Sequence, residues 1–573
     1  MTNRSGLQNS AASPLATTES LCTGSPVFEN PELQATACRE GALSAWKLAV
    51  LDQGIKAPAS VSGDFAVALR APGGGVFLAV DRFAIRSLCY RQVGSTLLFA
   101  ERADALADPG HELDSQAIFD YLFFHVIPSP RTIFKGVYRL PAAHCALFEN
   151  GVLKLAPYWT PNFSENISPS FESRRDEFRQ LIKDAVHSQV AGGDPAKTGC
   201  FLSGGTDSST VSGMLGLVTG QSASTYSIGF DAAGYDEMEF ARIASRHFKT
   251  RHHEYYVTPD DLVRSIADVA AHYDQPFGNS SSLPAYYCAR MAKADGVHKI
   301  LAGDGGDELF GGNSRYAMQR IFGWYGTVPA AFRTGVMEPL LERPAVRRIP
   351  LLRKASGYVG QAKVAMPDRL QMHNLLLRLG VENVLTPGFI AGVDTSLPGR
   401  QQREVWASAG TDSEINRMLA FDWRYTLAEN DLPKVCGTTR LAGIDVGFPF
   451  LDQRLLEFSL KLPVSYKLKG LKLRWFFKEA LRGFLPDQII SKKKQGFGLP
   501  FGVWATKNDG LKRLATDSLY SLAERGIVRT EFIKSLITDR LAEHPGYYGE
   551  MVWILMMLEQ WLRHHAPNHR QLG

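Results

Sequence analysis

A dozen residues near position 200 have the composition of an anion-binding turn. Residues 198–209 read Thr-Gly-Cys-Phe-Leu-Ser-Gly-Gly-Thr-Asp-Ser-Ser. Cys200–Leu202 is a short apolar run typical of a buried parallel strand, and apolar residues continue at helical spacing after it, at Val211, Met214, Leu215 and Val218. A strand that ends in two glycines and opens a helix presents backbone N–H groups to an anion. We therefore predict a phosphate-binding loop at Ser203–Ser209, where Asp207 reaches phosphate only through a metal ion.

An ordinary Gly-Ser turn is the alternative interpretation of this segment. The Walker-type pattern Gly-x-x-x-x-Gly-Lys-[Ser/Thr] occurs nowhere in the chain, which argues against a kinase or a P-loop ATPase. The segment resembles instead the pyrophosphate-binding loop of ATP-pyrophosphatases, which cleave ATP between its α and β phosphates.

A second glycine-rich turn carries carboxylates. The apolar run Lys299–Ala302 is followed by Gly-Asp-Gly-Gly-Asp-Glu-Leu-Phe-Gly-Gly at 303–312, which contains Asp304, Asp307 and Glu308. Carboxylates together with substrate phosphates suit Mg²⁺, although acidic surface turns also have this composition. The predictions for the two loops support each other, because both loops follow strands and ligands bind at the carboxyl edge of a parallel sheet.

Composition places these loops in a globular chain of several domains. The 573 residues are 45% hydrophobic and 21% charged, and the formal charge of +5 does not favour nucleic-acid or membrane binding. The seven cysteines stand singly, which predicts reduced thiols rather than disulfides or a zinc site. No apolar run approaches 18 residues and the first residues do not resemble a signal peptide, so we expect a cytoplasmic protein.

The chain divides by pattern into a tail and two domains. Residues 1–30 lack periodicity and predict a flexible N-terminal tail. Residues 31–160 contain short apolar runs between glycine turns and predict an antiparallel domain, followed by a polar linker at 161–170. From 171 to 573, helical patterns alternate with apolar runs and then become mainly helical after Gly323. We predict an α/β fold: a doubly wound parallel sheet with a helical C-terminal part, plus the N-terminal antiparallel α+β domain.

Six segments in order resemble the synthetase domain of glutamine-dependent asparagine synthetase and its relatives. They are Ser203–Ser209, Tyr226–Phe230, Tyr235–Glu237, Gly303–Gly312, Phe448–Asp452 and Lys494–Gly498. The resemblance covers about residues 171–565 and implies an ATP-dependent, AMP-forming amide ligase. Residues 31–159 resemble the glutaminase domain of the same enzymes through Gly63–Ala66, Leu78–Arg86 and Leu98–Ala100.

The resemblance also implies roles for single residues. The ATP pyrophosphate would be held by Ser203, Gly204, Gly205, Asp207 and Ser208. The adenine site would be lined by Leu202, Ile228 and Gly229, with Gly303 and Asp304 also facing the nucleotide. Mg²⁺ would be bound by Asp207 and Asp307, and Lys494 would stabilise charge on the α-phosphate and pyrophosphate. A solvated charge run is the alternative for Lys494, which lies in Lys492-Lys-Lys494.

The chain departs from asparagine synthetases in both domains. It begins Met-Thr-Asn and lacks the Cys-Gly-Ile start, the Arg-Gly-Pro-Asp segment and the Asn-Gly-Glu segment of the glutaminase site, so we expect no glutamine hydrolysis. Where those enzymes have an Asp-Arg pair, a Glu and an Arg, this chain has Cys436-Gly437, Asp445 and Gly447. Loss of two arginines and gain of two glycines predict a wider pocket and argue against aspartate as the substrate.

Three functions remain open from the sequence. The first is a lasso-peptide macrolactam cyclase, which joins a peptide N-terminal amine to an Asp or Glu side chain and would work beside a protease or peptide-binding protein. The second is amidation of aspartate or another small carboxylate with free ammonia, and the third is a non-catalytic ATP-binding protein. In β-lactam-forming relatives a Tyr-Glu dyad occupies the positions of Asp304 and Asp445. The resemblance therefore implies that these two carboxylates lie close together, with one as the catalytic base. The alternative is that Asp304 supports the metal-binding loop and Asp445 caps a helix or pairs with Arg440.

Overall fold

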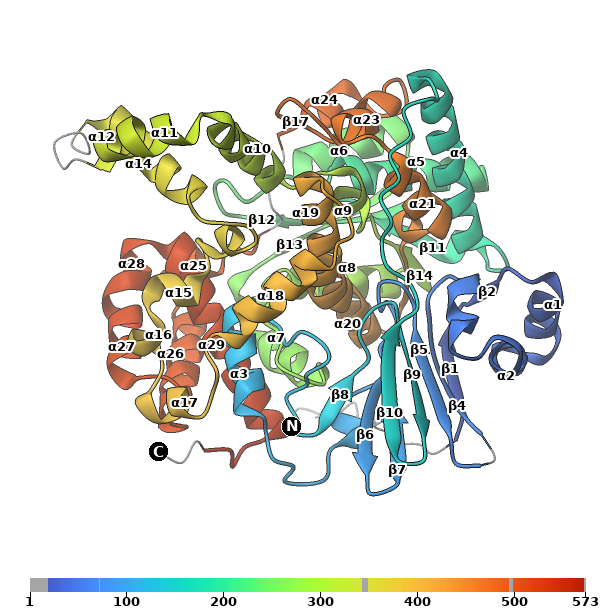
Figure 1. The fold of residues 1–573 in the computed structure, drawn as a ribbon, viewed down its shortest axis with the longest axis horizontal. Coiled ribbons are helices and arrows are strands. Elements are labelled where there is room, and N and C mark those ends of the chain that lie inside the picture. Colours follow the sequence, from blue (N-terminus) through green and yellow to red (C-terminus); the bar gives the residue numbers. More distant parts are fainter. Residues whose placement is uncertain (1–18, 72, 343–348, 494–497, 571–573) are drawn as a thin grey trace, which may run out of the picture. The chain divides into compact units, whose positions relative to one another are not determined.

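The computed structural model describes residues 19–71, 73–342, 349–493 and 498–570, which fall into two compact units (Figure 1). The antiparallel unit comprises residues 19–117 and 127–159. The parallel-sheet unit comprises residues 118–126 and those from 160 onward. Among the described residues, none of the helices combines the length and apolar content that a membrane-spanning helix needs.

Two main antiparallel sheets form the first unit. The larger has the strand order β1-β4-β5-β9-β10, with bounds Leu21–Gly24, Phe65–Arg70, Val76–Val80, His144–Glu149 and Val152–Pro157. The smaller has the order β7-β6-β8, with bounds Thr96–Ala100, Cys89–Val93 and Val137–Arg139. Its helices are α1 (Pro31–Glu40) and α2 (Ala42–Gln53), and α3 (Ser115–Phe124) crosses the boundary between the two units in the chain.

Alternate residues of the larger sheet face two different cores. Phe65 and Val67 of β4 pack in one core with Trp46 of α2, whereas Ala66 and Ala68 pack in another with strands of the smaller sheet. Because successive strand residues point to opposite faces, a strand that is covered on both sides must be apolar throughout. This explains the uninterrupted runs that predicted β4 and β5.

The prediction of a flexible tail over residues 1–30 is wrong at its C-terminal end. β1 pairs with β4 from Leu21↔Ala68 to Gly24↔Phe65, and β2 (Val27–Phe28) pairs with β3 (Val61–Ser62). Both strands are short and find their partners more than 30 residues away in the sequence, so local periodicity could not reveal them. Residues 1–18 of the predicted tail lie outside the described residues.

The second unit is built on a parallel sheet with the strand order β13-β12-β11-β14-β15. The strands are β11 (Thr198–Phe201), β12 (Ser224–Phe230), β13 (Arg251–Val257), β14 (Lys299–Leu301) and β15 (Asp445–Gly447). The chain runs outward from β11 to β13 and then returns to the other side of β11. The carboxyl ends of β11 and β14 therefore flank the point where the winding reverses, which is where open α/β sheets bind ligands.

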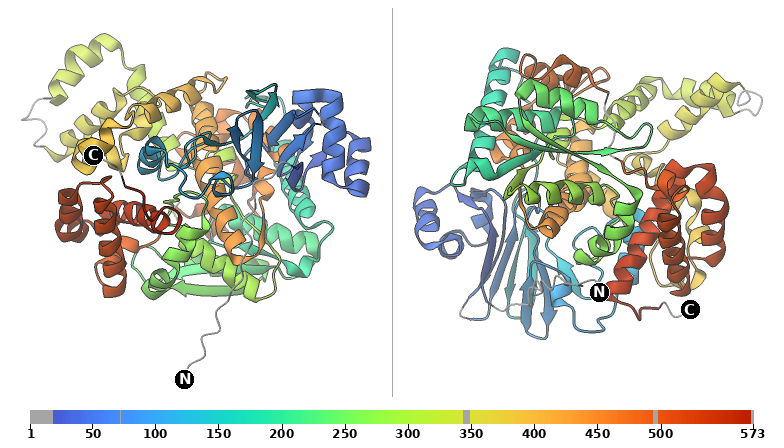
Figure 2. Two further views of the ribbon diagram at one scale, coloured as in Figure 1. Left: turned by 90° about the horizontal axis from the view of Figure 1, so that it is seen from below. Right: turned by 180° about the vertical axis from the view of Figure 1, so that it is seen from behind.

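Helices cover both faces of this sheet (Figure 2). One layer consists of α4 (Phe171–Val190), α5 (Thr206–Thr219) and α6 (Met238–Phe248), which pack on one another. The other consists of α7 (Pro259–His272), α8 (Ser282–Ala294) and α20 (Leu432–Ala442).

The region after Gly323 is mainly helical, as the pattern predicts, but it also supplies the edge strand β15. This three-residue strand has no periodicity of its own, and its place is set by pairing with β14. A small hairpin, β16 (Leu468–Lys469) and β17 (Lys472–Leu473), was also not predicted. The longer helices of this region are α10 (Ser314–Thr327), α14 (Pro350–Ala362), α18 (Leu397–Ala407), α19 (Glu414–Asp422), α21 (Gln453–Lys461), α26 (Asp509–Glu524) and α29 (Pro545–His565). The shorter ones that matter below are α9 (Gly306–Phe310), the π-helix η6 (Trp423–Asp431), α23 (Trp475–Ala480) and α24 (Asp487–Ser491).

Candidate active site

A cavity of ≈ 1030 Å³ opens at the carboxyl ends of β11, β12 and β14. Its walls come from the loops after β11 and β14, from α6, α8 and α20, and from the segment 471–493. Cavities that bind small ligands usually have a volume between about 300 and 1,000 Å³. This one is therefore large enough for a nucleotide and a second substrate.

The loop after β11 is held in shape by its own serines. Ser208 Oγ accepts a hydrogen bond from the backbone N–H of Ser203 at 3.1 Å and lies 3.0 Å from Ser203 Oγ. Helix α5 then begins with Gly205 as its N-cap, and no side chain caps that end. The uncapped helix start, with its positive dipole, is directed at the cavity lined by Ser203, Gly205 and Thr206.

Gly204 lets this loop lie against α6. Its φ is +67°, and a Cβ atom there would lie 2.4 Å from the backbone N of Ala241. Any larger residue would push the loop away from α6, so this position requires glycine for its conformation and for space.

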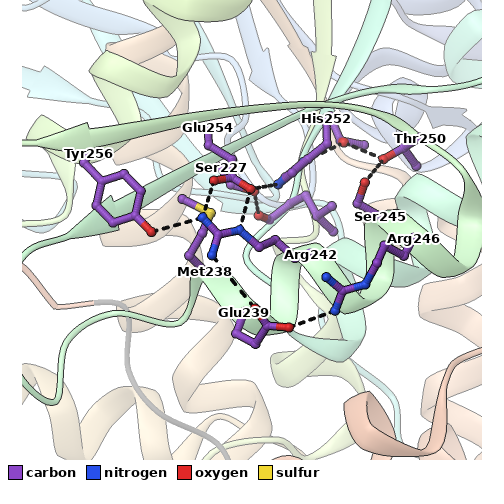
Figure 3. A network of polar contacts seen from close by, with 12 residues as sticks. Ser227, Met238, Glu239, Arg242, Ser245, Arg246, Thr250, His252, Glu254 and Tyr256 are labelled. Carbon is purple, nitrogen blue, oxygen red and sulfur yellow. Dashed lines mark hydrogen bonds and ion pairs between the residues drawn. The ribbon is translucent and has the colours of Figure 1, made fainter.

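A polar network fixes α6 against the neighbouring strands (Figure 3). Arg242 on α6 donates to both carboxylate oxygens of Glu254 on β13, at 2.8 and 2.6 Å, and to the hydroxyl of Tyr256 at 3.4 Å. The Tyr256 ring lies where a side chain at Gly229 would be, since a Cβ atom there would meet Tyr256 Cε1 at 2.6 Å. The network thereby positions α6, against which the phosphate loop packs.

Asp207 and Asp307 face each other from the two strand-end loops and share one arginine. Arg474 Nη1 donates to Asp207 Oδ1 at 2.7 Å and Oδ2 at 2.6 Å, and lies 2.7 Å from Asp307 Oδ1. Glycines make room for this arrangement: a Cβ atom at Gly306 would lie 2.4 Å from Asp207 Oδ1. A Cβ atom at Gly312 would lie 1.8 Å from Asp307 Oδ1.

This donor set fits a magnesium–nucleotide complex. The described part of the chain has no group of three or more His, Cys, Asp or Glu side chains that could hold a metal ion. Mg²⁺ is usually bound by one or two carboxylates together with substrate phosphates and water, so the pair Asp207 and Asp307 is the expected protein contribution. Thr206 Oγ1 is buried beside the loop with no hydrogen-bond partner among the described residues, as in a site that awaits a polar ligand.

Lysines line the phosphate side of the cavity. Lys492 Nζ lies 3.2 Å from Glu237 Oε2, 3.4 Å from the carbonyl oxygen of Gly204, and 4.5 Å from the centre of the Phe240 ring. Burial lowers the pKa of Lys492, and burial together with the nearby Arg474 lowers the pKa of Lys478. Cations at a phosphate loop stabilise the negative charge of a pyrophosphate leaving group.

Another part of the cavity lining combines three carboxyl groups with one ammonium group. Lys434 Nζ lies 2.9 Å from Asp431 Oδ1 and 3.9 Å from Asp304 Oδ1. Burial raises the pKa of Asp304 to about 6 and that of Glu308 to about 8. Burial lowers the pKa of Lys434, but the attraction of Asp431 and Asp304 outweighs this and raises it overall. Asp431 closes the π-helix η6, a type of helix that often occurs at functional sites.

The structure brings most of the predicted site residues to this cavity. Its lining includes Leu202, Ser203, Gly205, Asp207, Ser208, Ile228, Gly303, Asp304 and Asp307. Gly204 and Gly229 do not line it, because one packs against α6 and the other under Tyr256. Lys494 lies outside the described residues, although Lys492 and Lys493 just before it line the cavity.

The expectation that Asp445 lies close to Asp304 is wrong. Asp445 is exposed at the amino end of β15, opposite Lys299, whereas Asp304 follows the carboxyl end of β14. The three residue-to-residue steps from Lys299 to Ala302 alone put about 10 Å between the two ends. The parallel pairing thus places Asp445 at the edge of the sheet away from the cavity.

The two glycines that predicted a wider pocket do not widen it. A Cβ atom at Gly437 would meet the Tyr273 ring at 2.4 Å, and one at Gly447 would meet Gln189 Oε1 at 2.4 Å. Neither glycine lines the cavity, and neither does Cys436. Their space is filled by neighbouring side chains.

Sequence reasoning missed the charged residues that come from the C-terminal half. Arg474, Lys478, Asp431 and Lys434 all line the cavity. Asp431 and Lys434 are three residues apart, a spacing that places an acid and a base on one helical face, and this pattern could have been noticed in the sequence. Arg474 had none, because it is 267 positions away from Asp207 in the sequence.

Comparison with known proteins now identifies the family. Residues 177–563, more than half of the chain, match the family described as asparagine synthase, and residues 47–159 match the glutamine amidotransferase domain. The chain belongs to the asparagine synthase family.

Individual relatives are distant. The chain is 23% identical over 492 residues to asparagine synthetase [glutamine-hydrolyzing] 1 of Bacillus subtilis, an alignment that covers 84% of this chain and 74% of that protein. It is 23% identical over 496 residues to amidase chyE of Penicillium rubens, which covers 77% of this chain and 70% of that protein. A match to a protein of Mycobacterium bovis covers 65% of that protein, slightly less than two thirds of its length.

Proposed function

We propose that this protein is an ATP- and Mg²⁺-dependent ligase that forms an amide bond through an acyl-adenylate and releases AMP and pyrophosphate. The observation that carries the proposal is the meeting of the Ser203–Ser208 loop with the Asp207–Asp307 pair in one cavity at the sheet's reversal point. Membership of the asparagine synthase family supports the same chemistry.

The proposed reaction has two steps. A substrate carboxylate oxygen attacks the α-phosphorus, and the bond to pyrophosphate breaks. An amine nitrogen then attacks the acyl carbon, the bond to AMP breaks, and a base takes a proton from the nitrogen. The metal ion, held by Asp207 and Asp307, would neutralise phosphate charge, and the loop, Lys492 and Lys494 would bind the polyphosphate.

Asp304 is our candidate for the base. It lines the same cavity as the phosphate loop, Asp431 and Lys434. Burial raises its pKa to about 6, which lets it accept a proton near neutral pH. The alternative is that Asp304 only balances the charge of Lys434, at 3.9 Å.

We further propose that the nitrogen does not come from glutamine. In the antiparallel unit the Cys22 thiol packs against the core of Trp46, and burial raises its pKa to about 11. Cys89 and Cys145 are buried, and Cys38 is exposed near the C-terminal end of α1. Nothing in this described set resembles an activated nucleophile.

The best specific candidate is peptide macrolactam formation of the lasso-peptide type, in which both the amine and the carboxylate belong to one peptide. The volume of the cavity supports a substrate larger than aspartate, and its carboxyl-lined wall suits an incoming amine. Amidation of a small carboxylate with free ammonia is the alternative, and a partner protease or peptide-binding protein belongs only to the first possibility.

Isotope exchange separates these possibilities. We expect labelled pyrophosphate to enter ATP only when a carboxylate substrate is present, and AMP rather than ADP to accumulate on turnover. ADP as the stoichiometric product would refute the proposal. A panel of linear peptides with an N-terminal glycine and an internal Asp or Glu, compared with aspartate plus ammonium, identifies the substrate. Release of glutamate from glutamine above background would refute the absence of glutaminase activity.

A further inference from the structure

We propose that Arg474 is the built-in counter-ion of the Asp207–Asp307 pair, and that a divalent cation gains these carboxylates only when a nucleotide's phosphates draw the guanidinium away. The metal ion would then bind with ATP and not before it. This inference rests on the proposed ATP- and metal-dependent function, and it adds an order of binding and a residue that enforces the order.

The contacts of Arg474 resemble the oxygen shell of a cation. One nitrogen atom, Nη1, lies within 2.7 Å of three carboxylate oxygens, two from Asp207 and one from Asp307. The Arg474 side chain is 8% exposed, and those of the two aspartates are 19% and 17% exposed. At such short separations in a partly buried site, a guanidinium and a metal ion cannot share the same oxygens without strong repulsion.

The backbone around Arg474 is built to keep this arrangement. Its φ is +50°, in the left-handed region that residues other than glycine rarely adopt, and its N–H donates to the carbonyl oxygen of Gly311 at 3.2 Å. A Cβ atom at Gly312 would also lie 2.9 Å from Arg474 Cδ. The loop that carries Asp307 is thus tied to Arg474 through backbone and side chain together.

The cavity that Arg474 lines is also the proposed binding site of the nucleotide phosphates, which are suitable new partners for its guanidinium. A displaced guanidinium without a partner would be a nearly buried, unpaired charge, which is strongly unfavourable. Arg474 and Lys478, one helical turn apart, both line the cavity on the phosphate side. Phosphate oxygens could pair with the guanidinium through two parallel hydrogen bonds. Nucleotide and metal binding would therefore favour each other.

Manganese binding provides a test that does not depend on turnover, since Mn²⁺ accepts the same carboxylate ligands. Titration of the full-length protein with Mn²⁺ alone, followed by the electron paramagnetic resonance signal of free Mn²⁺, should show little binding to the wild type. With α,β-methylene-ATP present, and after correction for Mn²⁺ bound by the analogue in solution, binding should tighten by at least about tenfold.

Variants then identify the residue responsible. R474Q should bind Mn²⁺ without nucleotide at least about tenfold more tightly than the wild type, and R474Q combined with D207N should lose this gain. The matched control is R482Q, because Arg482 also lines the cavity but pairs with Glu479 at 2.6 Å. R482Q should bind Mn²⁺ as the wild type does.

Two results would overturn the proposal. One is wild-type affinity for Mn²⁺ that is the same with and without the analogue. The other is an R474Q protein that is folded but gains no affinity. If R474Q does not fold, the wild-type comparison with and without the analogue still tests the proposal. R474K provides a second variant: its shorter side chain should contact the two carboxylates less fully, so its affinity for Mn²⁺ without nucleotide should lie above that of the wild type. Failure of the wild type to bind the ATP analogue would instead count against the proposed function.

Discussion

A Cβ atom at position 312 would lie 1.8 Å from Oδ1 of Asp307, so the glycine there gives this carboxylate its place beside Asp207. The same glycine ends the turn that begins at Gly303 and precedes α10. Its role is therefore steric and local to the metal-binding pair.

Gly312→Ala should lower pyrophosphate exchange by about 100-fold or more, because Asp307 has to move away from its position opposite Asp207. The matched control is Gly323→Ala in α10, where a Cβ atom meets nothing within 4 Å. That change should leave exchange unaltered and stabilise the helix by about 0.5–1 kcal/mol. Equal rates in both variants would show that the position of Asp307 is not critical.

Asp304 and Asp445 should respond differently to substitution by asparagine. Asp304→Asn should retain substrate-dependent pyrophosphate exchange but lose amide product by about 100-fold, because the base acts after adenylation. Asp445→Asn should keep both rates within about twofold, since Asp445 is exposed at the far edge of the sheet. Exchange and product formation are measured on the same preparations. A loss of product in Asp445→Asn would restore the dyad that the sequence suggested.

Lys492→Met should raise the KM for ATP by about tenfold, because it removes a cation beside the phosphate loop. Glu237→Gln separates this effect from a structural one. It removes the partner of Lys492, at 3.2 Å, but leaves the ammonium group in the cavity. We expect a smaller change in KM from Glu237→Gln. A change as large as that of Lys492→Met would mean that the ion pair, rather than the charge, is needed.

Lys467 should make stability depend on pH. It is 1% exposed, donates to Asn416 Oδ1 at 3.0 Å, and lies 4.9 Å from the Phe163 ring centre. Burial lowers its pKa to about 7, whereas in the unfolded chain the lysine pKa is near 10.4. Between these values only the unfolded chain carries the proton, so stability should rise with pH, by up to about 1.4 kcal/mol per pH unit.

The test compares melting temperatures at pH 7 and pH 9.5. The difference between the wild type and Lys467→Met should shift in favour of the wild type as the pH rises. The exposed Lys461→Met is the control and should show no such shift. An identical pH profile for the wild type and Lys467→Met would mean that Lys467 keeps its proton in the folded protein.

The sequence by itself determined the two loops that build the nucleotide side of the site. Ser203–Ser209 and Gly303–Gly312 each consist of a strand end, a glycine turn and a helix start, and all three parts lie within a dozen residues. The hydrogen bond that Ser208 Oγ accepts from the Ser203 N–H and the positive φ of Gly204 are local features that residue type dictates. The runs that became β4 and β5 could be recognised because burial on both faces of a strand requires continuous apolar residues.

Only the tertiary structure decided what faces these loops. Arg474 contacts Asp207 although the two residues are 267 positions apart, and Lys434 of α20 lies close to Asp304 in the turn after β14. Both pairs therefore depend on tertiary packing and not on a local sequence pattern. The same applies to Asp445, which the family resemblance suggested as a base until the pairing of β15 with β14 placed it at the opposite edge of the sheet. Gly437 and Gly447 suggested open space until Tyr273 and Gln189 were found to fill it. The free energy of a contact between distant residues depends on where the whole fold places them, and no short stretch of sequence contains that information.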